Sequence, residues 1–222
     1  MCFSVEADLV AGAALVPLGV LSLRQVRSPS DVPLAALPLL FGAHQLVEAL
    51  VWAGIDGDVS AGLAHAAAWC YVVLALPVLP LLVPVAIYLA EDQHRRRVLP
   101  FVALGAATAV MMTATLVANG VEVVPYDHAI GYYVGLGPDD WVSTSLYVVA
   151  VVGACLAASS WVLRAFGVVN LVGLSLVALT FFDSLASTWC LFAAASSVLI
   201  LVHMTHRARE HDELVTKEPA TV

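Results

Sequence analysis

Long apolar runs alternate with short polar breaks along this chain. Most runs hold about 20 residues, and a helix of that length spans the roughly 30 Å apolar core of a bilayer. We therefore expect an all-α membrane protein, a bundle of seven transmembrane helices. The spans should cover about residues 5–23, 34–53, 61–90, 98–118, 142–163, 166–182 and 188–205. A polar cytoplasmic tail, residues 206–222, should follow and be frayed or disordered.

Two stretches depart from this simple alternation. Residues 61–90 would measure about 45 Å as one helix, too long for an upright crossing, and Pro77, Pro80 and Pro84 should kink or tilt it. Residues 119–141 form the one long connecting segment. Its acids and aromatic residues suit a cap that lies on the lipid headgroups.

The charges orient the seven spans. All nine lysines and arginines fall on one side of a seven-span arrangement, whereas six or eight spans would divide them. The positive-inside rule makes that side cytoplasmic, with the N-terminus outside and the C-terminus inside. The basic residues are Arg24, Arg27, Arg95, Arg96, Arg97, Arg164, Arg207, Arg209 and Lys217. The acids expected outside are Glu6, Asp8, Asp56, Asp58, Glu122, Asp127, Asp139 and Asp140.

Composition narrows the class of protein. Of the 222 residues, 61% are hydrophobic and 12% charged, while soluble domains carry about 25% charged residues. The net charge of −8 and the lack of a basic stripe exclude nucleic acid as a partner. Lys217 is the only lysine, so no span can hold a retinal Schiff base. The start has no basic region of a signal peptide, so we expect the first span to stay attached.

A weak internal repeat links the first three and last three spans. Its anchors are Leu23-Arg24 with Leu163-Arg164, Glu48 with Asp183, and Trp69-Cys70 with Trp189-Cys190. Two parallel three-helix halves joined by the fourth span, a 3+1+3 arrangement, would explain this order. Chance in a low-complexity apolar chain is the alternative, because the spacings differ.

The second span carries the most unusual residue, Glu48. A carboxylate within the membrane costs about 2.5 kcal/mol or more, so it is usually paired or functional. His44 lies one turn before it and Trp52 one turn after it, on the same helical face. The candidate ligand-binding residues of the outer half are Glu48, His44, Trp52, His65, Trp69, Asp183 and Trp189.

Three classes of function stay open. We favour an outward-facing polar pocket that binds or translocates a small molecule or ion. A zinc-type intramembrane hydrolase is the second, with His44, Glu48 and His65 as ligands of zinc or copper. A structural or assembly subunit is the third. Cys2 and Cys190 are candidates for a disulfide at the oxidising face. Membrane lipids are the other expected partners.

The start Met1-Cys2-Phe3-Ser4, the LPLLFG run of the second span and the step from Glu48 to Trp52 resemble one family. So does the run from Trp189 to Ala194, with Ser187 before it and His203 after it. The chain is similar to an uncharacterised family of bacterial multi-pass membrane proteins that open with these four residues. The resemblance covers most of the chain. It implies a location in the bacterial plasma membrane, and it implies no activity.

Overall fold

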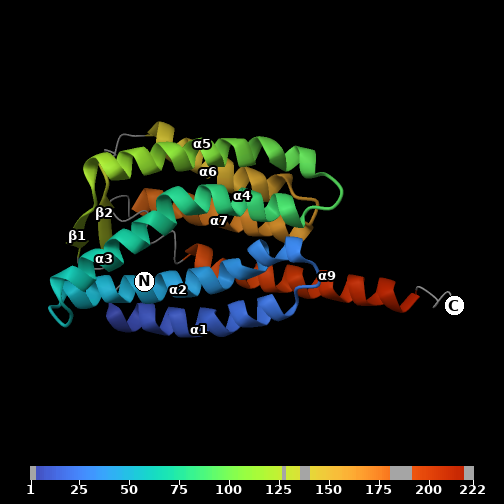
Figure 1. The fold of residues 1–222 in the computed structure, drawn as a ribbon, viewed down its shortest axis with the longest axis horizontal. Helices are drawn as coiled ribbons and strands as arrows, with labels where there is room; N and C mark the ends of the chain where they lie inside the picture. The colour runs from blue at the N-terminus through green and yellow to red at the C-terminus, as the bar shows by residue number, and fades with distance from the viewer. Residues whose placement is uncertain (1–3, 127–128, 136–140, 181–191, 218–222) are drawn as a thin grey trace.

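The computed structural model describes residues 4–126, 129–135, 141–180 and 192–217, which form a bundle of helices roughly aligned with its long axis (Figure 1). The α-helical class expected from the sequence is confirmed. The helices are α1 (Val5–Arg24), α2 (Val32–Ile55), α3 (Ala61–Val73), α4 (Leu79–Ala90), α5 (Arg95–Asn119), α6 (Trp141–Ala157), α7 (Trp161–Thr180) and α9 (Val198–Lys217). A 3-10 turn, η1 (Pro29–Asp31), precedes α2.

Among the residues that the structure describes, five helical stretches are long and apolar enough to cross a membrane. They are Val5–Arg24, Pro29–Ile55, Ala61–Ala90, Arg95–Asn119 and Trp161–Leu179. The apolar helix α6 is shorter, with 17 residues. These helices indicate a membrane protein.

The long third run changes from α-helix to π-helix at Pro77, whereas Pro84 lies inside α4. A π-helical segment, η2 (Leu74–Val78), joins α3 to α4 and contains Pro77. Pro80 follows in the first turn of α4. A proline has no N–H to donate to the preceding turn, and a π-helical turn absorbs that mismatch.

The predicted fifth span, residues 142–163, is wrong at its end. The helix α6 ends at Ala157, and α7 begins at Trp161. The chain turns here because the Ser159 N–H donates to Glu91 Oε2 at 2.7 Å instead of continuing the helix. Leu163-Arg164 therefore belongs to the start of α7 and does not close a span, which removes one anchor of the proposed repeat.

The prediction of a frayed tail is also wrong for residues 206–217. The helix α9 continues through them to Lys217. Ion pairs hold it, since Arg207 lies 3.0 Å from Asp31 and 2.9 Å from Asp92, and Asp212 lies 3.0 Å from Arg27. The sequence pattern showed polar residues here but not their partners on other turns.

A β-hairpin stands where a headgroup cap was expected. The strands β1 (Glu122–Tyr126) and β2 (Ala129–Tyr133) pair antiparallel, with Val123 opposite Tyr132. Ile130 is fully buried, so β2 packs onto the helices. Gly120 and Gly135, with φ of +78° and +77°, flank the hairpin and adopt a backbone conformation that other residues rarely take.

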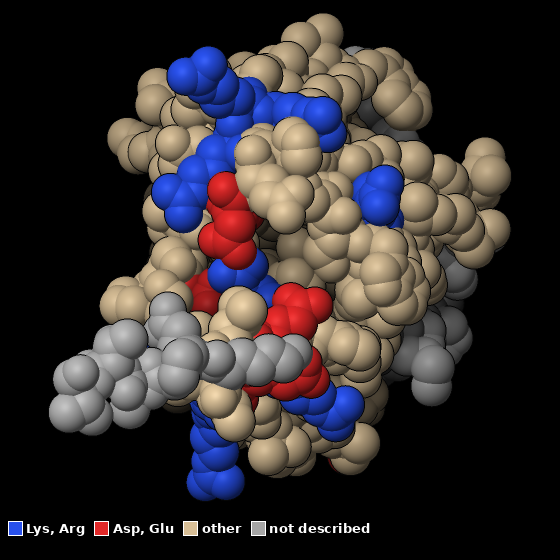
Figure 2. All heavy atoms as spheres, turned by 90° about the vertical axis from the view of Figure 1, so that its right-hand side faces the viewer, with Lys and Arg blue, Asp and Glu red and all other residues tan. Residues whose placement is uncertain are grey.

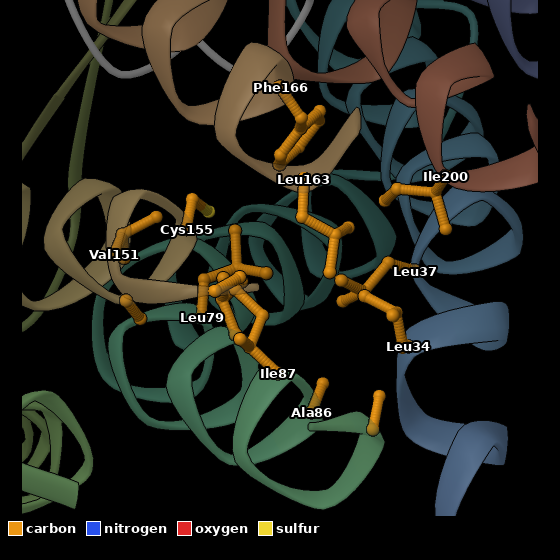
Figure 3. Packing of buried hydrophobic residues seen from close by; sticks show 14 of the residues in the cluster. Leu34, Leu37, Leu79, Ala86, Ile87, Val151, Cys155, Leu163, Phe166 and Ile200 are labelled. Atoms are coloured by element: carbon orange, nitrogen blue, oxygen red, sulfur yellow. The ribbon is translucent and has the colours of Figure 1, made fainter. Parts of the chain in front are cut away.

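Close helix packing sets the positions of α1 and α2. A side chain at Gly19 of α1 would collide with the backbone of Leu39, and one at Gly12 would collide with the side chain of Leu46. Small residues thus let two membrane helices approach closely. Figure 3 shows the apolar core beside them, where α2, α4, α6, α7 and α9 contribute side chains such as Leu37, Ile87 and Phe166.

The two ends of the bundle differ in content. The α2–α3 turn and the β-hairpin share one end, which we call the hairpin end (Figure 1). The α1–α2, α4–α5 and α6–α7 turns and the C-terminal part of α9 share the other. Lysines and arginines surround that face, together with acids (Figure 2). All nine basic residues belong to these segments, and we call this the basic end.

Candidate functional site

At the hairpin end, α2 turns a polar face into the protein. Gln45 and Glu48 are fully buried, and His44 is 1% exposed. Trp52, one turn further, is buried against Ala68 and neighbouring apolar residues. The spacing of these residues places them on one side of the helix. The sequence-based grouping of His44, Glu48 and Trp52 on a common buried face is therefore what the structure contains.

A second carboxylate, Asp8 of α1, is also fully buried. The close approaches of Gly19 to Leu39 and of Gly12 to Leu46 define an antiparallel register. Asp8 lies one turn before Gly12 and so reaches about the depth of Glu48. From the sequence, Asp8 was expected at the outer end of the first span, and it was not singled out as a site residue. The signal it missed is the buried stripe Asp8, Gly12, Leu15, Gly19 and Ser22, spaced three or four residues apart.

Three stacked rings connect α2, α3 and the hairpin. Tyr71 lies parallel to His44, with ring centroids 3.9 Å apart, and Tyr132 stacks on the other side at 4.4 Å. His44 Nε2 lies 3.0 Å from the Tyr71 carbonyl oxygen and donates to it. In the neutral ring Nδ1 is then an acceptor. This atom is buried, and no hydrogen-bond partner for it occurs among the described residues.

The hairpin contacts the buried acid directly. The Tyr132 hydroxyl donates to Glu48 Oε1 over 3.4 Å. Neither Tyr71 nor Tyr132 was singled out as a site residue from the sequence. Their roles depend on contacts between segments far apart in the chain, and no local spacing reveals such contacts.

The remaining predicted site residues do not belong to the buried face of α2. His65 is on the exposed side of α3, where its Nε2 accepts from Trp69 Nε1 at 3.0 Å. Trp69 itself packs against the cluster that contains Tyr71. Asp183 and Trp189, and the candidate disulfide pair Cys2 and Cys190, are outside the described residues.

No metal centre is evident in the described ranges. They contain no group of three or more histidine, cysteine, aspartate or glutamate side chains that could hold a metal ion. The set His44, Glu48 and His65, with zinc or copper, stays a sequence-based prediction.

Comparison with known protein families assigns the chain to a family. A family model described as "Family of unknown function (DUF6629)" matches residues 1–214. The chain belongs to this family. Membership in DUF6629 confirms the resemblance to an uncharacterised family. No curated protein and no solved structure matches the chain.

Proposed function

We propose that this DUF6629 protein spans the bacterial plasma membrane seven times, with the N-terminus outside and the C-terminus in the cytoplasm. Five helices of the described ranges are long and apolar enough to cross a membrane. The 17-residue α6 is at the lower limit for a crossing, and the span that leads into α9 makes seven. The gathering of all nine basic residues at one end supports a cytoplasmic position for that end.

We further propose that the hairpin end holds an outward-facing polar site that binds or translocates a small cation or proton. The observation that carries this proposal is the pair of buried acids, Asp8 and Glu48, at one depth on packed helices. Two carboxylates buried at one depth of a membrane protein lose hydration when they ionise, and their like charges disfavour the doubly ionised state. A proton or a cation held near them offsets both costs.

The neighbouring groups suit the same ligand class. His44 offers a buried acceptor nitrogen at Nδ1. Its ring is fixed in place by the stack with Tyr71 and Tyr132. Tyr132 belongs to the hairpin, and its hydroxyl reaches Glu48. Access from the outside would then depend on how the hairpin packs on the bundle.

Cation and proton binding by the full chain in detergent tests this proposal. Calorimetry with monovalent and divalent cations, and proton uptake during a pH titration, should give a signal for the wild type that Glu48→Gln loses. Glu122→Gln is the matched control, because Glu122 is an exposed acid of the same end, and it should keep the signal. Equal signals from the wild type and Glu48→Gln would refute the site.

A further inference from the structure

A second polar region lies at the basic end, opposite the acid site. A cavity of about 440 Å³ opens between the α4–α5 turn, the α6–α7 turn and α9. Figure 2 views this end. The volume falls in the range of small-molecule sites. Its lining includes charged groups of both signs, so the class of ligand depends on which of them are already engaged.

The acids of the two turns are engaged within the protein. Glu91 Oε1 accepts from the backbone N–H groups of Gln93 and His94, at 3.2 Å each, and Oε2 accepts from that of Ser159 at 2.7 Å. Desolvation raises the pKa of Glu91, but these N–H donors outweigh it and hold the pKa below 4.5. Asp92 pairs with Arg207 at 2.9 Å. Both carboxylates therefore already have donors within the protein.

The groups less engaged are mostly donors. The contact of Arg164 is a long one, 3.5 Å from its guanidinium to the Ser159 carbonyl oxygen. His206 is exposed on α9, as is the remaining acid, Glu210. His203 is 7% exposed and binds Ser160 Oγ through Nδ1 at 3.0 Å. Its Nε2 is buried, and no partner for it occurs in the described part of the chain.

The first turn of α7 adds positive potential to the same cavity. Trp161, Val162 and Leu163 line it, and they open a 20-residue helix. The first N–H groups of a helix lack intrahelical partners, and the helix dipole favours an anion there. The helix start and the buried imidazole of His203 are two independent features that lie at one cavity.

We propose that this cavity binds the phosphate group of a small molecule, held by Arg164, His203 and the N-terminus of α7. A guanidinium binds phosphate oxygens in pairs, and His203 Nε2–H supplies a donor when Nδ1 accepts from Ser160. The phosphate can belong to a phospholipid headgroup of the adjacent leaflet or to a soluble compound. Trp161, which is 67% exposed at the rim, suits contact with lipid.

The test uses the full chain in a maltoside detergent, which carries no phosphate. Glycerol phosphate is titrated by calorimetry, and phosphatidylglycerol binding is followed by native mass spectrometry against diacylglycerol. Arg164→Gln should weaken binding of the recognised probe at least tenfold. His203→Gln tests the buried imidazole independently and should weaken it by a smaller factor. Arg96→Gln, at an exposed arginine of the same end outside the cavity lining, should stay within twofold of the wild type.

The outcomes separate the two sources. Binding of glycerol phosphate that depends on Arg164 assigns a soluble ligand, and binding of phosphatidylglycerol alone with the same dependence assigns a lipid headgroup. The proposal is overturned if neither probe binds, or if Arg96→Gln weakens binding as much as Arg164→Gln does. The acid site at the hairpin end is not involved, so its failure and the failure of this cavity are distinguishable.

Discussion

The Tyr132 hydroxyl connects the hairpin to the buried acid Glu48. Tyr132→Phe keeps the ring that stacks on Tyr71 and removes the hydroxyl that donates to Glu48. A hydrogen bond of this kind contributes roughly 1 kcal/mol. We therefore expect a change of about three- to tenfold in cation or proton affinity, measured by the same calorimetry. Tyr133→Phe is the control, because its hydroxyl pairs with Tyr126; an equal effect of both variants would contradict the role of Tyr132.

Glu91 should make stability depend on acid pH. Its pKa is lowered below 4.5 in the folded protein, so its stabilising contribution is present above about 4.5 and is lost as the pH falls through the lowered value. Glu91→Gln should cost about 1 to 3 kcal/mol at neutral pH and flatten the acid side of the stability profile. Thermal unfolding in detergent from neutral to acid pH measures this. A profile as steep as that of the wild type would argue against it; Glu210→Gln, at an exposed site, should change little.

Candidate site residues could be predicted from the sequence where a polar side chain lies inside an apolar span, because burying it in a membrane costs free energy. Glu48 and His44 stood out because a polar residue inside an apolar run needs a reason. Asp8 did not stand out, because it lies four residues into the first helix, where a surface position was equally reasonable. Its burial depends on how closely the glycines let α1 approach α2.

The α1–α2 contact depends on the absence of a side chain at Gly19. Gly19→Val would push against the Leu39 backbone, which cannot move like the end of a flexible side chain. We expect a loss of about 1 to 3 kcal/mol in stability. Gly62→Ala, at a helical position with open space, should be neutral or slightly stabilising. Thermal unfolding of both variants in detergent measures this difference. Similar midpoints for the two variants would mean that the α1–α2 contact is not tightly packed.

Two ion pairs attach α9 to the rest of the bundle, and we expect them to contribute different free energies of stabilisation. Arg207→Ala leaves Asp31, whose side chain is 4% exposed, as a buried charge without this partner. Removing the partner of a buried acceptor costs about 1 to 3 kcal/mol. Asp212→Ala breaks an exposed pair with Arg27, worth about 0.2 to 1 kcal/mol. Hydrogen exchange in α9 should rise clearly for the first variant only, and equal exchange in both would contradict this ranking.

Element boundaries followed the sequence wherever local chemistry determined them. Of the three prolines in the third run, Pro77 marked the π-helical segment, whereas Pro84 lies inside α4. The hairpin was missed although Val123, Val124, Tyr132 and Tyr133 are typical strand residues, because the tyrosines also suited a headgroup cap. The extension of α9 depends on partners from other turns, which no window of sequence contains.

The molecule as a whole is polarised along its long axis. One end gathers all nine basic residues and the cavity of about 440 Å³, and the other holds the buried acids near the hairpin. The positions of the basic residues in the chain already predicted this polarity. These residues follow every second predicted span, and the segments after every second span lie on the same side of a membrane. Both proposals use the same orientation in the membrane, in which the hairpin end faces outward and the basic end faces the cytoplasm.

Thiol labelling of intact cells tests this membrane orientation most directly. Single cysteines are placed at Asp58, exposed in the α2–α3 turn, and at Arg96, exposed at the start of α5, after the four native cysteines have been replaced. An impermeant reagent should label the cysteine at position 58 in intact cells. It should label the one at position 96 only after the cells are opened. Labelling at position 96 in intact cells with none at position 58 would contradict the account.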